Sequence, residues 1–240
     1  MASDLQARIA ALAAGQGLTE FVPDTAFPLL ARLVSALEST PAPPTRLVTT
    51  KDILEGHIAD SLSALGISGV RDAAVIGDIG SGAGFPGLAL AAALPAARVD
   101  LIEATARKCE VITKLAEQAG IGNAFAIAER VETWAGGAGR GAYDVASARA
   151  VAMLPVLVEY AAPLLKPDGI FVAWKGGQDE AEAEAGRKAA ELVGLTATDV
   201  LAVTPFPGSH SRHLHVFRKT SETPERFPRR PGIPSKRPLA

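Results

Sequence analysis

The sequence predicts an α/β fold with a mostly parallel seven-stranded sheet, preceded by a helical extension. From residue 75 onward, short apolar runs alternate with segments of helical periodicity. This alternation is typical of βαβ units, whose parallel sheet is covered by helices on both faces. The last two apolar runs, residues 197–203 and 213–219, have no helix between them. We expect these runs to pair as an antiparallel hairpin at the edge of the sheet.

The region before this alternation is expected to be helical. Apolar residues recur there at helical spacing, and the proline-rich stretch 40–44 should break the pattern. The first segment reads as an amphipathic helix with Leu5, Ile9 and Leu12 on one face, and not as a signal peptide. Three helices are predicted, over about residues 3–14, 24–38 and 51–65.

The alternating region supplies the elements of the sheet in order. Strands are expected over residues 75–79, 98–104, 124–129, 143–148 and 169–175. Helices are expected over residues 86–94, 106–120, 151–165 and about 178–193, with only a short turn after the third strand. The stretch from residue 221 is rich in proline and arginine, so we expect it to be extended rather than helical. The chain thus divides into a helical extension (1–66), a core domain (67–220) and a basic tail (221–240).

Charge and cysteine content restrict the possible partners. The 240 residues carry a net charge of −2, but the basic residues that follow Arg212 are accompanied by only two acids, Glu222 and Glu225. A basic tail on an acidic body suggests a polyanionic partner, and a merely solvated tail is the alternative. Cys109, the single cysteine, excludes an internal disulfide framework and fits a reducing, cytoplasmic compartment. No apolar run reaches the roughly 18 residues of a membrane span, so no membrane partner is expected.

A glycine loop follows the first predicted strand. Gly80, Gly82 and Gly84 form GxGxG, whereas a dinucleotide fingerprint would place its third glycine where Phe85 stands. The next helix should begin with Pro86, which has no N–H group to offer a phosphate. The loop therefore favours a ligand without a pyrophosphate, such as S-adenosylmethionine, while a nucleotide site or a purely structural loop remains an alternative.

Two acids accompany the loop. Asp78 lies just before the glycines, where it could contact the amino-acid part of such a cofactor or cap the following helix or loop. Glu103 ends the second predicted strand, where a carboxylate can accept hydrogen bonds from both ribose hydroxyls. Its alternative role is a charge at a strand end. The ribose role is common to NAD and S-adenosylmethionine sites, so Glu103 supports an adenosine ligand without choosing between them.

Several further stretches occur in a fixed order over most of residues 46–240. They are HIADSL (57–62), DIGSGAGFPG (78–87), RVE (130–132), SARA (147–150), KG (175–176), RHL (212–214) and PRRPGIPSK (228–236). With these stretches the chain resembles the RsmG (GidB) family, which methylates N7 of a guanosine in bacterial 16S rRNA. Five parallel strands closed by a hairpin are also the arrangement of class I S-adenosylmethionine-dependent methyltransferases, the fold class that we expect here.

The resemblance implies S-adenosylmethionine as cofactor and 16S rRNA or the small ribosomal subunit as partner. We expect a cytoplasmic monomer. By position, the family's cofactor contacts fall on Gly80, Phe85, Val131, Glu132 and Arg149. The residues discussed above add Asp78, Gly82 and Glu103 to this cofactor site.

The implied reaction needs few catalytic groups. Guanine N7 carries a lone pair and no hydrogen, so it needs no general base, and the protein mainly aligns the reactants and excludes water. No residue is therefore assigned as catalytic. The positioning candidates are His57 and Asp60, which share a helical face, together with Arg149 and Lys175 at predicted strand ends. His57 and Asp60 could equally brace their helix, and Arg149 could form a surface salt bridge.

The RNA contacts are expected from basic residues at the strand ends and in the tail. They are Arg149, Lys175, Arg212, Arg229, Arg230 and Lys236. His213 and His215 share a strand face but have no cysteine or acid near them in sequence, so no metal site is predicted. Three other functions are alternatives: a methyltransferase for another RNA or a protein, a non-catalytic RNA-binding module, and a nicotinamide oxidoreductase, which the loop disfavours.

Overall fold

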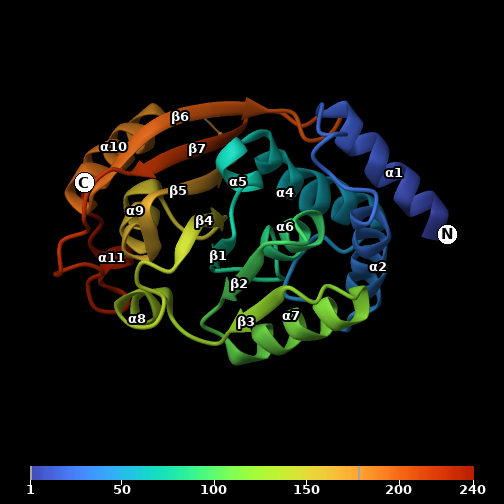
Figure 1. The fold of residues 1–240 in the computed structure, drawn as a ribbon, viewed down its shortest axis with the longest axis horizontal. Helices are drawn as coiled ribbons and strands as arrows, with labels where there is room; N and C mark the ends of the chain where they lie inside the picture. The colour runs from blue at the N-terminus through green and yellow to red at the C-terminus, as the bar shows by residue number, and fades with distance from the viewer. Residues whose placement is uncertain (1, 178) are drawn as a thin grey trace.

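Seven strands form one sheet in the computed structural model, which describes residues 2–177 and 179–240. The strands are β1 (Val75–Ile79), β2 (Arg98–Ile102), β3 (Ala124–Ile127), β4 (Tyr143–Arg149), β5 (Leu165–Lys175), β6 (Leu195–Val203) and β7 (Arg212–Lys219). They are arranged in the order β3-β2-β1-β4-β5-β7-β6, running diagonally across the view of Figure 1.

The strand directions confirm the predicted sheet. Strand β1 pairs in parallel with β2 and β4, and β2–β3 and β4–β5 are parallel too. Strand β7 lies antiparallel between β5 and β6, as the predicted hairpin requires. The chain order of the strands reverses between β1 and β4. In open α/β sheets, the crevice outside the carboxyl ends of the strands at such a reversal is where ligands bind.

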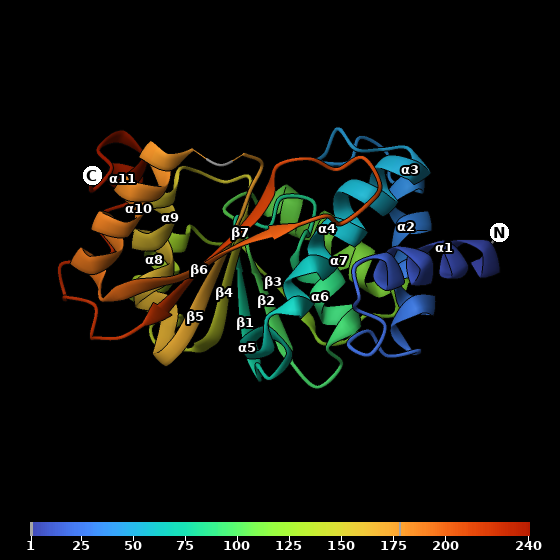
Figure 2. The same cartoon turned by 90° about the horizontal axis from the view of Figure 1, so that it is seen from above.

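Helices cover both faces of the sheet. The main ones are α1 (Ala2–Gly15), α2 (Ala26–Ser39), α6 (Gly87–Ala93), α7 (Ala106–Ala119), α8 (Val131–Gly136), α9 (Leu154–Ala161) and α10 (Glu180–Val193). Figure 2 shows α2, α6 and α7 on one side of the strands and α8, α9 and α10 on the other. Two separate apolar clusters fill these two layers. Within the described chain, no helix combines the length and apolar character needed to cross a membrane.

The third N-terminal helix differs from the expected continuous helix over 51–65. It consists of short pieces: α3 (Thr50–Asp52), a π-helix η1 (Ile53–Ala59), α4 (Asp60–Leu62), a 3₁₀ turn (Ser63–Gly66) and then α5 (Ser68–Arg71). Its apolar residues stay buried through the changes of pitch. A π-helical stretch is rare and often accompanies a functional site, because it redirects the side chains that follow it. Here it brings His57 and Asp60 to the carboxyl edge of the sheet.

Two expectations about the second half of the chain are corrected. The short turn expected after the third strand is the helix α8. The tail, expected to be extended throughout, contains one short helix, α11 (Ile233–Lys236). The tail also packs on the body, because Phe227 is only 3 % exposed and belongs to the apolar cluster around α9. Arg140 donates to the carbonyl oxygens of Thr223 and Phe227 and fixes this segment further.

Candidate functional site

The glycine loop lies at the carboxyl end of β1, next to the reversal in strand order. Gly80, Gly82 and Gly84 all have positive φ angles, of 65°, 59° and 96°. A Cβ atom on Gly80 would lie 2.7 Å from the side chain of Val151, and one on Gly84 would lie 2.5 Å from Leu88. A Cβ on Gly82 would meet only the carbonyl oxygen of Gly80, at 3.8 Å. Packing therefore requires the two outer glycines, whereas Gly82 leaves room on the open side of the loop.

Two adjoining cavities flank this loop. The loop cavity, of about 380 Å³, is lined by Gly80, Gly82, Phe85, His57, Glu103, Lys108, Arg149 and neighbours. The strand-end cavity, of about 210 Å³, is lined by Gly80, Glu103, Val131, Glu132, Tyr160, Ser235 and neighbours. Gly80, Glu103 and Val151 line both cavities. The structure therefore brings seven of the eight predicted cofactor residues to one continuous surface.

Glu103 stands at the boundary of the two cavities. It directly follows β2 and is only 6 % exposed. Its carboxylate accepts hydrogen bonds from the backbone N–H groups of Gly82, at 3.2 Å, and Thr105, at 2.9 Å. Lys108 lies 3.6 Å from the same carboxylate. These contacts hold the carboxylate in one position, which the role predicted for Glu103, accepting hydrogen bonds from ribose hydroxyls, would require.

Asp78 is the predicted cofactor residue that the structure places elsewhere. Its side chain is fully buried beneath the loop and lines neither cavity. It accepts hydrogen bonds from the N–H of Gly87, which begins α6, and from the hydroxyl of Ser147. Of the two roles considered from sequence, the geometry supports the cap. Burial raises the pKa of this carboxyl to about 6, although its hydrogen bonds oppose the shift.

Asp78→Asn is expected to alter the pH dependence of stability in a defined direction. The native carboxyl holds its proton to about pH 6, whereas an ordinary aspartate loses it near pH 3.8, so the native state binds more protons between these values. The wild-type protein therefore loses stability as pH rises through this window, by up to roughly 1.4 kcal/mol per unit, and the isosteric amide does not. The free energy of unfolding of the variant minus that of wild type should rise between pH 4 and 6.

Urea unfolding at several pH values measures this difference. Other titrating groups are common to both proteins, so their contributions cancel in the subtraction. Asp72→Asn, at an exposed aspartate, controls for the removal of a carboxylate. A difference that stays constant from pH 4 to 7 would show that the Asp78 carboxyl is not shifted upward.

Arg149 ties the HIADSL segment to the end of β4. Its guanidinium donates to the Oδ2 of Asp60 at 2.8 Å, to the carbonyl of Gly56 at 2.7 Å and to the Nδ1 of His57 at 2.7 Å. Each of these bonds spans about ninety residues of sequence. Three of the four positioning candidates, His57, Asp60 and Arg149, therefore form one hydrogen-bonded group between the N-terminal region and the sheet.

His57 is held as a neutral ring in this group. Because Arg149 donates to Nδ1, the proton of the imidazole lies on Nε2, which is 3.0 Å from the hydroxyl of Thr45. The ring stacks on Phe85 with centroids 4.3 Å apart and an angle of 9° between the planes. Burial, assisted by the charge of Arg149, lowers the pKa of His57 to about 3. His57 is thus uncharged near neutral pH and shapes the wall of the loop cavity together with Phe85.

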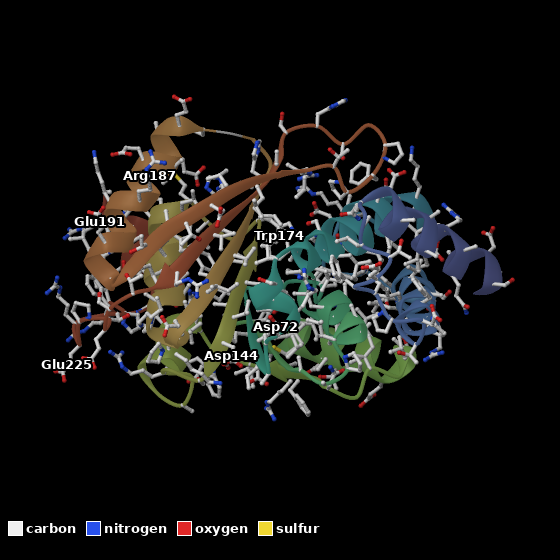
Figure 3. All side chains as sticks on the ribbon, turned by 45° about the horizontal axis from the view of Figure 1, so that its top comes forward. Asp72, Asp144, Trp174, Arg187, Glu191 and Glu225 are labelled. Carbon is white, nitrogen blue, oxygen red and sulfur yellow. The ribbon has the colours of Figure 1, made fainter. Side chains whose placement is uncertain are left out.

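A third cavity lies at the carboxyl ends of β4 and β5, and we call it the β4–β5 cavity. Its volume is about 280 Å³, and it adjoins the loop cavity through Arg149 and Ala150, which line both. The complete lining consists of Asp60, Arg149, Ala150, Trp174, Lys175, Gly176, Arg212 and His213. Figure 3 shows Trp174 where β5 meets the N-terminal helices, at the opposite end of the sheet from Asp144.

The six residues predicted to contact RNA fall into two groups. Arg149, Lys175 and Arg212 line the β4–β5 cavity, where Lys175 also pairs with Glu182. Arg229, Arg230 and Lys236 lie in the tail. Arg230 and Lys236 are exposed, but Arg229 forms a two-pronged ion pair with the fully buried Glu159.

The tail also contributes to the strand-end cavity. Glu132, which lines this cavity, accepts a hydrogen bond from the N–H of Gly232 at 2.8 Å. The hydroxyls of Tyr160 and Ser235 lie 3.0 Å apart, and both residues line the same cavity. Neither of these two lining residues was predicted from the sequence, and nor were Lys108 and Trp174. The sequence contains a local sign for Lys108, because this basic residue lies in the first turn of the helix that follows Glu103. Tyr160 and Ser235 come together only through tertiary packing, so no local pattern identifies them.

A metal site and a nucleophilic cysteine are the other chemistries to compare with this edge. Among the described residues, no group of three or more His, Cys, Asp or Glu side chains is arranged to hold a metal ion. Cys109 is buried in α7, where its thiol donates to the carbonyl of Glu103 and burial raises its pKa. Cys109 lines none of the three cavities at this edge.

Comparisons with known proteins agree with this site. A family model described as rRNA small subunit methyltransferase G matches residues 44–214. Proteins named ribosomal RNA small subunit methyltransferase G are 43% identical in Rubrobacter xylanophilus, over 78% of this chain and 73% of that protein, and 40% identical in Deinococcus radiodurans, over 81% and 78%.

Solved structures agree on the fold. A putative O-methyltransferase from Klebsiella pneumoniae superposes with a TM-score of 0.53 at 18% identity, over 81% of this chain and 90% of that one. A putative sarcosine dimethylglycine methyltransferase from Galdieria sulphuraria gives 0.52 at 14%, over 67% and 83%. These similarities confirm the predicted class I methyltransferase fold. With the family match over most of its length, the chain belongs to the rRNA small subunit methyltransferase G family.

Proposed function

We propose that the protein transfers a methyl group from S-adenosylmethionine to N7 of a guanosine in 16S rRNA. The observation that carries the proposal is the series of three adjoining cavities along the carboxyl ends of the strands. Two of them flank the glycine loop, and the third is lined by Lys175, Arg149 and Arg212. A cofactor site beside a basic acceptor site is what methyl transfer to a polyanion requires.

The cofactor fits the residues that line the first two cavities. Glu103 presents a fixed carboxylate for ribose hydroxyls at their boundary, and Gly82 leaves its backbone open to close approach. Val131 and Glu132 would bound the adenosine part in the strand-end cavity, with Phe85 and Arg149 beside the amino-acid part in the loop cavity. When bound, the cofactor supplies a methyl group already activated by its sulfonium.

The residues of the chain then contribute mainly by aligning the methyl donor with guanine N7. Guanine N7 has no proton to remove, and His57, the titratable ring nearest the loop, is neutral and committed to two hydrogen bonds. Arg149 holds His57 and Asp60 against the sheet and so fixes the wall between the loop cavity and the β4–β5 cavity. Holding two reactants in attacking geometry and excluding water can supply roughly 7–11 kcal/mol of the barrier reduction.

The RNA partner is supported by two groups of cations. Lys175 and Arg212 lie at the β4–β5 cavity, and the exposed Arg230 and Lys236 extend the positive charge onto the tail. Such residues neutralise phosphates and make binding salt-dependent. We further propose that the protein acts as a monomer in the cytoplasm, because one chain supplies all three cavities and Cys109 is a free thiol.

Methyl transfer from labelled S-adenosylmethionine to naked rRNA, free small subunits and whole ribosomes tests the function. We expect label in 16S rRNA, with mass mapping placing it at one guanine N7. Label in another RNA or in protein would favour a different substrate. RNA binding without transfer to any of the three would favour a binding module. Calorimetry with S-adenosylmethionine, its demethylated product and NAD separates the cofactor classes, and binding of NAD alone would contradict the proposal.

A further inference from the structure

We propose that the β4–β5 cavity binds the target guanine by its Watson–Crick edge, with the Asp60 carboxylate as the acceptor that selects guanine. This inference rests on the proposed function and adds to it a specificity-determining residue. Asp60, Trp174 and His213 line one cavity at the ends of β4 and β5, directly beside the loop cavity. The acceptor of a methyl group must lie beside the donor, so the position suits a base.

Asp60 carries an unused acceptor in this cavity. The residue is 3 % exposed, and only its Oδ2 is bound, by Arg149 at 2.8 Å. Its Oδ1 has no hydrogen-bond partner among the described residues. The Nε of Arg212 lies 4.0 Å from this oxygen, beyond hydrogen-bond distance. A buried carboxylate oxygen without a donor is unfavourable, so such an atom on a cavity wall points to a ligand that donates.

His213 supplies a second unused polar atom in the same cavity. Its Nδ1 is buried and likewise lacks a partner within the described part of the chain. His213 lies opposite Lys175 in the β5–β7 pairing, and both residues line the cavity. As the N–H tautomer, Nδ1 can donate to a carbonyl oxygen. The cavity therefore offers one acceptor and one donor, neither of which is satisfied by the described residues.

Guanine matches this pair in chemistry. Its Watson–Crick edge presents two donors, N1–H and the 2-amino group, beside an acceptor, O6. Adenine presents an acceptor at N1 and would place a lone pair against the carboxylate. N7 belongs to the other ring of guanine, away from N1 and the 2-amino group, so a base held by Asp60 leaves N7 free to face the loop cavity.

The remaining wall suits a flat ring rather than a phosphate. The indole N–H of Trp174 donates to the backbone carbonyl of Asp60 at 2.8 Å, which fixes its ring in the wall. An aromatic ring can stack on an extruded base. A phosphate has no N–H donor and would leave the Oδ1 of Asp60 without a partner, whereas Arg212, which is partly exposed, can hold phosphates outside the cavity.

An inosine substitution at the target nucleotide tests the inference. Inosine keeps N7, O6 and N1–H and lacks only the 2-amino group, so the comparison isolates one donor. With wild-type protein, kcat/KM should fall roughly tenfold or more from the guanosine to the inosine substrate. Asp60→Asn should lower kcat/KM for guanosine RNA by at least that factor. For Asp60→Asn, kcat/KM should be nearly the same with guanosine RNA and inosine RNA, because the substitution and the inosine change both remove the contact between Asp60 and the 2-amino group.

The controls separate recognition from folding. Arg230→Ala, in the exposed part of the tail, should lower kcat/KM equally for the guanosine and inosine RNAs, so the ratio of the two values should stay as in the wild type. Calorimetry should show that Asp60→Asn still binds S-adenosylmethionine. Equal rates of the wild-type protein on the two RNAs would overturn the inference even if the variant failed to fold, and so would an unchanged ratio in Asp60→Asn. Absence of methyl transfer to the guanosine RNA by wild type would instead contradict the proposed function.

Discussion

Replacing Gly82 with valine is expected to lower the affinity for S-adenosylmethionine by at least about a hundredfold. The added Cβ meets only the Gly80 carbonyl oxygen in the protein, at 3.8 Å, so the branched side chain is accommodated at the wall of the loop cavity. It then occupies the space through which a ligand approaches the loop backbone. The φ of 59° adds roughly 1–2 kcal/mol of strain, which should appear as a modest loss of stability and not as unfolding.

Calorimetry with the cofactor and its demethylated product measures this effect. Gly141→Val is a matched control, because Gly141 has a φ of 60°, lines none of the three cavities, and an added Cβ there meets nothing within 4 Å. The control should bind the cofactor like wild type. Unchanged affinity in Gly82→Val would remove the loop from the cofactor site.

Replacing Arg229 with alanine is expected to destabilise the protein by about 3–5 kcal/mol, because it leaves the Glu159 carboxylate buried without a counter-charge. Glu159 is fully buried in α9, and Arg229 reaches both of its oxygens, at 2.8 and 2.6 Å. For a chain of this length the midpoint of thermal unfolding should fall by roughly 6–20 °C. The double variant Arg229→Ala with Glu159→Gln should recover part of the loss, since it removes the unpaired charge.

The neighbouring arginine provides the comparison. Arg230 is exposed, so Arg230→Ala should change stability by less than about 0.5 kcal/mol. It should instead weaken RNA binding. The slope of log affinity against log salt concentration should become shallower by the amount expected for the loss of about one phosphate contact. Thermal unfolding and RNA titrations at several salt concentrations distinguish the two arginines. Equal melting temperatures for the two single variants would contradict a stabilising role for the Arg229 ion pair.

Local patterns in the sequence were sufficient to predict the sheet and the loop. The strands from 75 to 219 follow from apolar runs, because a parallel strand is buried on both faces and carries its signal in its own residues. The contrast between Gly82 and Phe85 likewise identifies a loop of the methyltransferase type, since backbone freedom depends on the residue itself. The resemblance to the family added the stretches outside the loop.

Features that depend on distant partners could not be predicted. Arg229 looked like one of several tail cations because Glu159, its partner, lies seventy residues away. The only sign of a buried ion pair in the sequence was Glu159 itself, a single acid within the apolar run of α9. Asp78 was ambiguous for the same reason, as the choice between cap and cofactor contact depended on where Gly87 and Ser147 would lie. The π-helical pitch of residues 53–59 is imposed by packing and has no separate signal in the sequence.

The contact of the tail with the strand-end cavity has a consequence for the order of events during synthesis. Gly232 and Ser235 emerge from a translating ribosome after all seven strands. A nascent chain can therefore pair its whole sheet while Glu132 still lacks the Gly232 amide and the cavity wall still lacks Ser235. The proposed site for the methyl donor is therefore complete only once Gly232 and Ser235 have left the exit tunnel, so a chain whose sheet has already paired still lacks part of that site.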